Sequence, residues 1–210
     1  MRIETFVLGE LSTNCYLVFD EVTGQALVID PADSGETISL RLLELGLTLE
    51  AIALTHGHFD HVLGLLELHL NFPTAPIYMH PKDSFLLQKA QSSALHWLHK
   101  TVDPVPQATL PYPKPELSVG ALTFKVLELP GHTPGSIGLY HAEEGVLFSG
   151  DTVFRNGVGR TDFSYSSPLK LSTSLAKIHR LPAATQIFSG HGEPTTLLGI
   201  KHAPDQSSIG

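Results

Sequence analysis

The most constraining feature of the chain is one seven-residue stretch, Thr55-His56-Gly57-His58-Phe59-Asp60-His61. The apolar run at residues 49–54 before it predicts a buried strand, and residues 62–68 after it have the apolar spacing of a helix. Three imidazoles and a carboxylate are therefore expected to crowd a strand-to-helix turn. Such clusters are typical of metal sites, because imidazole nitrogen and carboxylate oxygen suit zinc, iron and manganese. The alternative is a solvated polar turn that happens to be rich in histidine.

The spacing inside this stretch predicts two groups of ligands. If the backbone is extended at the turn, His56 and His58 converge on one ion. Asp60 and His61 fall where the helix begins and point elsewhere, which suits a second ion.

Composition indicates an ordinary globular protein and argues against several functional classes. The chain has 210 residues, 42% of them hydrophobic, which is enough for a substantial core. Its net charge of −8 and its lack of a basic run argue against nucleic-acid binding. No segment approaches the ~20 apolar residues of a membrane span, and residues 1–5 do not begin a signal peptide. With Cys15 as the only cysteine, we expect a cytoplasmic protein in which Cys15 is a small buried hydrophobe.

Hydrophobic periodicity predicts an α/β fold over residues 1–200 and a loose polar tail at 201–210, and a chain of this length fits one large domain or two small ones. Helices are expected at 34–47, 62–68, 82–100 and 168–180, with Gly46 ending the first of them. Five prolines between residues 103 and 115 predict an extended loop that borders the active-site cleft. Strands are expected at 3–8, 14–19, 25–30, 49–54, 76–80, 122–129, 137–141, 145–149 and 186–189.

Three further residues, His132, Asp151 and His191, each lie at or just past the end of an apolar strand and beside glycine. Strand ends gather at one edge of the sheet in layered α/β folds, so we expect these residues to meet the histidine-rich stretch. Asp30 also ends a strand, where it either orients a ligand histidine or caps the loop. His80, before Pro81, is expected to lie in a loop outside the site. The candidate ligands are too many for one tetrahedral zinc and suit two ions: His56, His58, Asp60, His61, His132, Asp151 and His191.

These motifs, in this order, resemble those of the metallo-β-lactamase-fold hydrolases, and most closely their glyoxalase II-like branch. The resemblance covers roughly residues 3–198, and its His-x-His-x-Asp-His motif falls on residues 56–61. It implies a four-layer αββα sandwich, built as a single domain from two similar halves, with the metals at one edge. It also implies the ligand sets: His56, His58 and His132 for one ion, Asp60, His61 and His191 for the other, and Asp151 as the bridge.

Details of the sequence separate the branches of this family. Asp151 stands where many β-lactamases of this fold carry cysteine, which argues against an antibiotic-hydrolysing enzyme. The loop at residues 159–163 resembles that of small glyoxalase II-like proteins and also that of the iron-dependent persulfide dioxygenases. Full-length glyoxalase II carries an extra C-terminal helical region that binds glutathione, and the sequence ends at Gly210 without a match to it.

The resemblance implies a metal-dependent hydrolase of thioesters such as S-D-lactoylglutathione. The expected chemistry is attack of a hydroxide held between two divalent ions, zinc first and iron or manganese as alternatives, with Asp60 as the catalytic carboxylate. Arg160 is expected either to bind an acidic group of the substrate or to pair with Asp162. The competing functions are a mononuclear-iron persulfide dioxygenase and a non-catalytic metal-binding module. A nuclease is disfavoured by the acidic charge.

Overall fold

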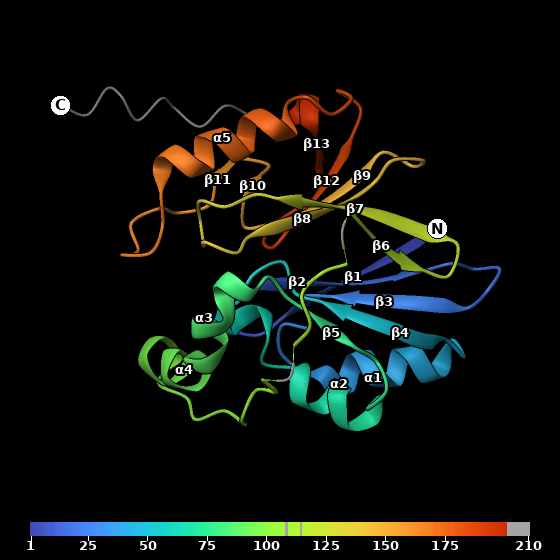
Figure 1. Ribbon diagram of the computed structural model, residues 1–210. Coiled ribbons are helices and arrows are strands. Elements are labelled where there is room, and N and C mark those ends of the chain that lie inside the picture. The colour runs from blue at the N-terminus through green and yellow to red at the C-terminus, as the bar shows by residue number, and fades with distance from the viewer. Residues whose placement is uncertain (108, 114, 201–210) are drawn as a thin grey trace.

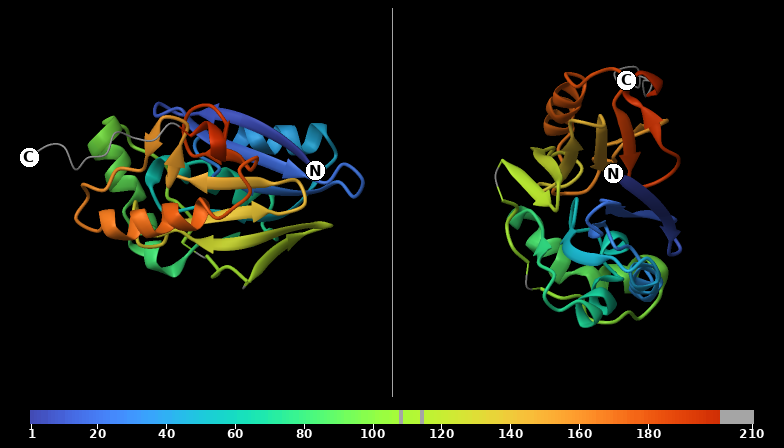
Figure 2. Two further views of the ribbon diagram at one scale, coloured as in Figure 1. Left: turned by 90° about the horizontal axis from the view of Figure 1, so that it is seen from above. Right: turned by 90° about the vertical axis from the view of Figure 1, so that its right-hand side faces the viewer.

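The computed structural model describes residues 1–107, 109–113 and 115–200, so the expected tail at 201–210 lies outside the described residues. Its elements form four layers (Figure 1). Helices cover the outer face of one sheet, a second sheet packs on the inner face of the first, and a further helix covers the second sheet. Two further views (Figure 2) place the blue-to-green first part of the chain against the yellow-to-red second part. The predicted αββα sandwich is confirmed.

The first sheet contains five strands in the order β1-β2-β3-β4-β5. Strands β1 to β3 pair antiparallel, whereas β3, β4 and β5 run parallel. Their bounds are Arg2–Leu8, Thr13–Phe19, Gln25–Ile29, Thr48–Ala53 and Ile77–Tyr78.

The second sheet contains six strands in the order β13-β12-β9-β8-β7-β6. Strands β9 and β12 are parallel, and the other neighbours pair antiparallel. From β6 to β9 the bounds are Glu116–Val119, Leu122–Glu128, Ile137–His141 and Val146–Gly150, followed by β12 Gln186–Ser189 and β13 Thr195–Thr196. A small separate hairpin pairs β10 Val153–Phe154 with β11 Gly157–Val158.

The helices cover the outer faces of the two sheets. Helix α5, Pro168–Ile178, begins where sequence rules expect, because the Ser167 side chain accepts a hydrogen bond from the Lys170 amide and proline occupies the first turn. Helix α1 ends just before Gly46, which adopts a φ of 63°. The first sheet is covered by the helices α1 Gly35–Glu44, α2 Leu65–Asn71, α3 Ser84–Gln88 and α4 Ala90–Leu98. Short 3₁₀ turns are found at Phe59–His61 and Pro81–Asp83, and a third follows β13 at Leu197–Gly199.

Successive side chains of the first sheet point to opposite faces, so the sheet contributes to two hydrophobic cores, one under the helices and one between the sheets. In β2, Leu17 packs with the helices while Val18 packs between the sheets, and both are fully buried. Cys15 lies on the helix-facing side of the same strand and is fully buried, as predicted. In the second sheet, Leu147 faces α5 and Phe148 faces the first sheet. Burial on both faces fixes the register, because a one-residue slip would exchange the two sets.

Several predicted bounds differ from the structure. The helix expected at 82–100 is divided at Lys89 into α3 and α4, and the strand expected at 76–80 contains only Ile77–Tyr78. The helix expected from residue 62 starts at Leu65, because a 3₁₀ turn at Phe59–His61 precedes it. Four strands of two to four residues, β6, β10, β11 and β13, were not predicted, because so few residues carry no readable period. Within the described ranges, no helix is long and apolar enough to span a membrane.

Candidate metal centre

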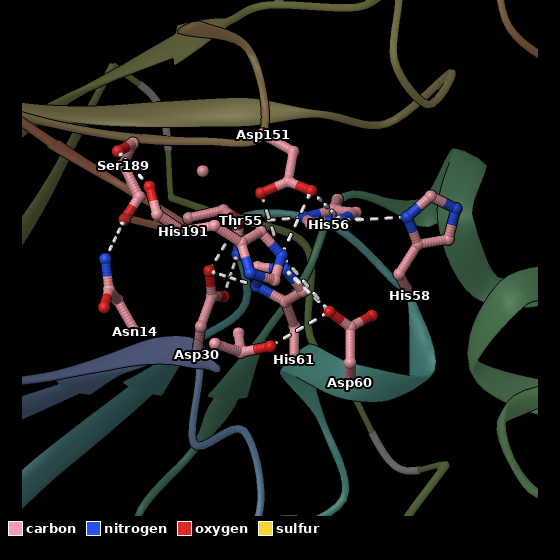
Figure 3. A network of polar contacts seen from close by, with 12 residues as sticks. Asn14, Asp30, Thr55, His56, His58, Asp60, His61, Asp151, Ser189 and His191 are labelled. Atoms are coloured by element: carbon pink, nitrogen blue, oxygen red, sulfur yellow. Dashed lines mark hydrogen bonds and ion pairs between the residues drawn. The ribbon is translucent and has the colours of Figure 1, made fainter. Parts of the chain in front are cut away.

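The strand directions bring the predicted site residues to one edge of the sandwich. Strands β7 and β9 are both antiparallel to β8 and so run the same way, and β12 is parallel to β9. The loops after β7, β9 and β12 carry His132, Asp151 and His191 respectively. In the first sheet, the loop after β4 carries the histidine-rich stretch. All seven predicted ligands meet at this edge, as the argument from strand ends required. Figure 3 shows His56, His58, Asp60, His61, Asp151 and His191.

The first group joins His56, His58 and His132, one nitrogen from each lying within 4.8 Å of the others. The Nδ1 atom of His58 is 3.1 Å from Nε2 of His56 and 3.0 Å from Nε2 of His132. His58 precedes the 3₁₀ turn with an extended backbone, which matches the conformation expected for the two histidines to converge.

The second group joins Asp60, His61 and His191, again with one ligand atom each within 4.8 Å. Asp60 Oδ2 is 3.5 Å from Nε2 of His61 and 3.3 Å from Nε2 of His191. Asp60 and His61 lie in the 3₁₀ turn, whereas His58 before it is extended. The rings of His61 and His56 are nevertheless neighbours, with centroids 4.2 Å apart, so the two groups adjoin.

Asp151 lies between the two groups. Its Oδ2 is 3.5 Å from His132 Nε2 and 3.6 Å from His191 Nε2, and its Oδ1 is 3.5 Å from His61 Nε2. Gly190 makes this approach possible, because a Cβ there would collide with Asp151 Oδ1 and with the ring of His61. One carboxylate thus faces both groups, as a bridging ligand must.

The second nitrogen of each histidine in the two groups also has a partner, which fixes the orientation of each ring. Asp30, whose role was left open, is such a partner, because its Oδ2 is 3.0 Å from His61 Nδ1. Its Oδ1 also accepts a hydrogen bond from the Thr55 amide, and its Oδ2 accepts one from the Thr55 hydroxyl. The parallel register of β3 and β4 places Asp30 beside Thr55. The other contacts are Thr55 Oγ1 with His56, the Tyr165 hydroxyl with His58, and the carbonyl oxygens of Arg160 with His132 and of Leu11 with His191.

Electrostatics differ between the two groups. Burial, with the neighbouring His132, lowers the pKa of His58 to about 3, so this ring is neutral, the form that binds metals. Burial alone would lower the pKa of His61 too, but the carboxylates of Asp60, Asp151 and Asp30 raise it to about 10. The second group therefore lies in a field that strongly favours positive charge.

The residues at the edge fit a pair of metal ions. His61 Nε2 and Asp151 Oδ1 are buried polar atoms without a hydrogen-bond partner among the described residues, and they face each other. Buried polar atoms are rarely left unpaired, and a cation held by this nitrogen and this oxygen would satisfy both. Imidazole and carboxylate donors in this number suit two zinc, iron or manganese ions.

A buried carboxylate that sequence reasoning missed ties the ligand loops together. Asp83 is fully buried and accepts hydrogen bonds from the Gly57 amide, the Thr133 hydroxyl and the Gly135 amide, at 3.1, 2.7 and 2.6 Å. These donors flank His56, His58 and His132. No local motif marks Asp83, because its partners come from two distant loops.

A cavity of about 290 Å³ opens over the site and is lined by His58, Asp60, His132, Asp151 and His191 together with apolar and aromatic side chains. Arg160 lies at its border and pairs with Asp162 at 2.6 and 2.5 Å, the pairing weighed from the sequence. The proline-rich segment was expected to border this cleft, and that was wrong: none of its described residues lines the cavity, and Tyr112 is buried between the sheets instead. Residues of α3 and α4 take that place. His80 lies outside the cavity lining and caps a 3₁₀ turn.

The sandwich fold and the histidine–aspartate cluster at its edge define a metallohydrolase-type protein. A family model described as the metallo-beta-lactamase superfamily matches residues 8–191, and the chain belongs to this superfamily. Hydroxyacylglutathione hydrolase GloC of Haemophilus influenzae is 34% identical over 199 residues, covering 94% of this chain and 93% of its own.

Two solved structures have the same fold over nearly their whole length. One, described as the BLEG-1 B3 metallo-beta-lactamase, is 32% identical with a TM-score of 0.86, covering 97% of this chain and 98% of its own. The other, TTHA1623 in a di-iron-bound form, is 37% identical with a TM-score of 0.86, covering 96% and 98%.

The contact between Asp30 and His61 leads to a first prediction. Asp30→Asn should keep the backbone, since asparagine tolerates the φ of 50° found there, but an amide cannot accept all three hydrogen bonds. We expect metal affinity to fall by about 10–100-fold. Competition with a chromogenic chelator measures this, and affinity equal to that of the wild type would contradict the role given to Asp30.

Proposed function

We propose that the chain is a binuclear metal-dependent hydrolase of thioesters, with S-D-lactoylglutathione as the type substrate. The observation that carries the proposal is the position of Asp151 between two complete groups of ligands. The kinship with a hydroxyacylglutathione hydrolase supports the choice of substrate.

In this proposal His56, His58 and His132 hold one ion, Asp60, His61 and His191 hold the other, and Asp151 bridges them. When bound, the two ions supply a hydroxide near neutral pH and polarise the carbonyl under attack. The fold orients each imidazole through a hydrogen bond to its second ring nitrogen.

Asp60 is the proposed catalytic carboxylate. Its Oδ2 accepts a hydrogen bond from Thr13 Oγ1 at 3.0 Å, which holds the side chain over the second group. Oδ1 receives no hydrogen bond from the described residues, and Asp60 lines the cavity, so Oδ1 is the atom that would orient and accept the proton of the attacking water. Burial would raise the pKa of Asp60, but His61 and His191 hold it below its usual range and keep the carboxylate ionised.

The test combines elemental analysis with activity on one sample purified without added metal. About two ions per chain, together with release of thiol from S-D-lactoylglutathione, support the proposal. About one iron without thioester cleavage, with oxygen uptake on glutathione persulfide, indicates the dioxygenase instead. A chromogenic β-lactam belongs in the same assay because one matched structure is named as a β-lactamase, and bound metal with no turnover of any substrate leaves the non-catalytic module.

Arg160 is the proposed contact for an acidic group of the substrate, and two variants separate that role from its ion pair. Arg160→Ala keeps the backbone carbonyl that holds His132, so metal content should not change. We expect KM for S-D-lactoylglutathione to rise about 3–10-fold with little change in kcat, because an exposed charged contact is screened by solvent. Asp162→Asn frees the guanidinium and should leave KM unchanged or lower it. A matching rise of KM in both variants would mean that Arg160 acts only through Asp162.

A further inference from the structure

The side chains beside the first ligand group form a wall that thioester hydrolysis alone does not explain. The rings of Phe163 and Tyr165 stack at 5.2 Å with an angle of 14° between their planes, and Phe85 of α3 meets Tyr165 edge-on at 5.4 Å. The Tyr165 hydroxyl is anchored on His58 at 2.8 Å. One side of the cavity is thus a fixed aromatic surface directly beside the first ligand group.

The rest of the wall is apolar and partly open to solvent. Leu86 comes from α3 and Trp97 from α4, while Leu11 comes from the loop after β1. Trp97 is the only tryptophan of the chain, and its side chain is 55% exposed. Because Trp97 lines the cavity, its ring offers a large apolar contact to a ligand bound there.

The cavity offers little free charge apart from the ligands themselves. Arg160 is paired with Asp162, and its guanidinium lies 4.4 Å above the ring of Phe163. The Arg160 guanidinium therefore lies next to the aromatic stack, and Asp162 balances its charge. A neutral apolar group fits this wall better than a charged one.

A second cavity, of about 620 Å³, meets the first at His191. Arg155, Asn156 and Glu193 contribute to its lining and are exposed. Its size falls within the usual range for a whole small ligand, whereas about 290 Å³ lies at the lower limit of that range. By size, the larger, peptide-like thiol part of a thioester fits the larger cavity, which leaves the smaller one for the acyl group.

We propose that the cavity bounded by Trp97 and by the Phe163–Tyr165 stack is an acyl pocket that selects apolar, and above all aromatic, acyl groups. The inference rests on the proposed thioester hydrolysis and goes beyond it, because it names the class of acyl group. Trp97 is then a specificity-determining residue, and the preferred substrates are aryl-substituted acyl thioesters.

The test uses two substrates that differ by one group, S-D-lactoylglutathione and S-mandeloylglutathione, in which phenyl replaces methyl. The metal-loaded wild type should favour the mandeloyl thioester by about tenfold in kcat/KM, since the phenyl ring buries more apolar surface. Trp97→Ala should bring that ratio close to one, and Trp97→Phe should restore it. Leu95→Ala is the matched control, because Leu95 lies on the same helix, is also 55% exposed and does not line the cavity.

Binding provides a second measurement that does not depend on turnover. Trp97 is the sole tryptophan, so its fluorescence should change on titration with S-benzylglutathione, which should bind about tenfold more tightly than S-methylglutathione. If neither thioester is hydrolysed but this difference in binding is found, the proposed reaction fails while the apolar pocket stands. Equal kcat/KM for the two thioesters, or a preference that persists in Trp97→Ala, would overturn the inference.

Discussion

Asp151→Ala is expected to lower the metal content below two ions per chain and to abolish thioester hydrolysis. The oxygens of Asp151 face both ligand groups, at 3.5 Å from His132 Nε2 and from His61 Nε2. Without it, two ions would sit close together with no shared negative charge to reduce their repulsion. We expect kcat/KM to fall by at least on the order of 10³-fold, because the hydroxide needs both ions.

Elemental analysis and thiol release on the same sample measure the two effects of this variant. Asp103→Ala is a suitable control, because Asp103 is exposed and lies outside the cavity lining. The control should keep both metal content and turnover. Normal turnover by Asp151→Ala would rule out the two-metal mechanism, whatever its metal content.

The candidate ligands were predictable from sequence because of where they lie in the chain. The residues at 56–61 share one turn, so their spacing alone separates two groups, and the structure has the extended backbone at His58 and the 3₁₀ turn at Phe59–His61 that this separation needs. His132, Asp151 and His191 were found by a different rule, that of strands ending at a common edge. That rule depends only on strand direction, which periodic apolar segments reveal well.

The contacts around the ligands were not predictable, for a physical reason. Tyr165 meets His58 across 107 positions of sequence, and the partners of His132 and His191 are backbone carbonyl oxygens, which every residue carries. Asp30 was recognised as a candidate only because it ends a strand. Side chains that act through distant tertiary contacts leave no period or motif to read.

Asp83 is the clearest case of such a residue, and its replacement should have the largest effect on stability. In Asp83→Ala, the amides of Gly57 and Gly135 and the Thr133 hydroxyl lose the acceptor they share in a fully buried setting. We expect unfolding free energy to fall by about 3–5 kcal/mol, since each buried unpaired donor carries a penalty and the three are not additive. For a chain of this length that is a drop in Tm of roughly 10 °C.

Metal affinity should fall in the same variant, because Asp83 joins the loop that carries His56 and His58 to the loop that carries His132. Chemical unfolding with and without metal, together with chelator competition, separates the two effects. Asp83→Asn keeps one acceptor oxygen and should lie between the wild type and alanine in both measurements. Gly135→Ala approaches the same contact from the other loop, since its Cβ would stand 2.6 Å from Asp83 Oδ1. If Asp83→Ala unfolds like the wild type, the two loops are held by something other than this carboxylate.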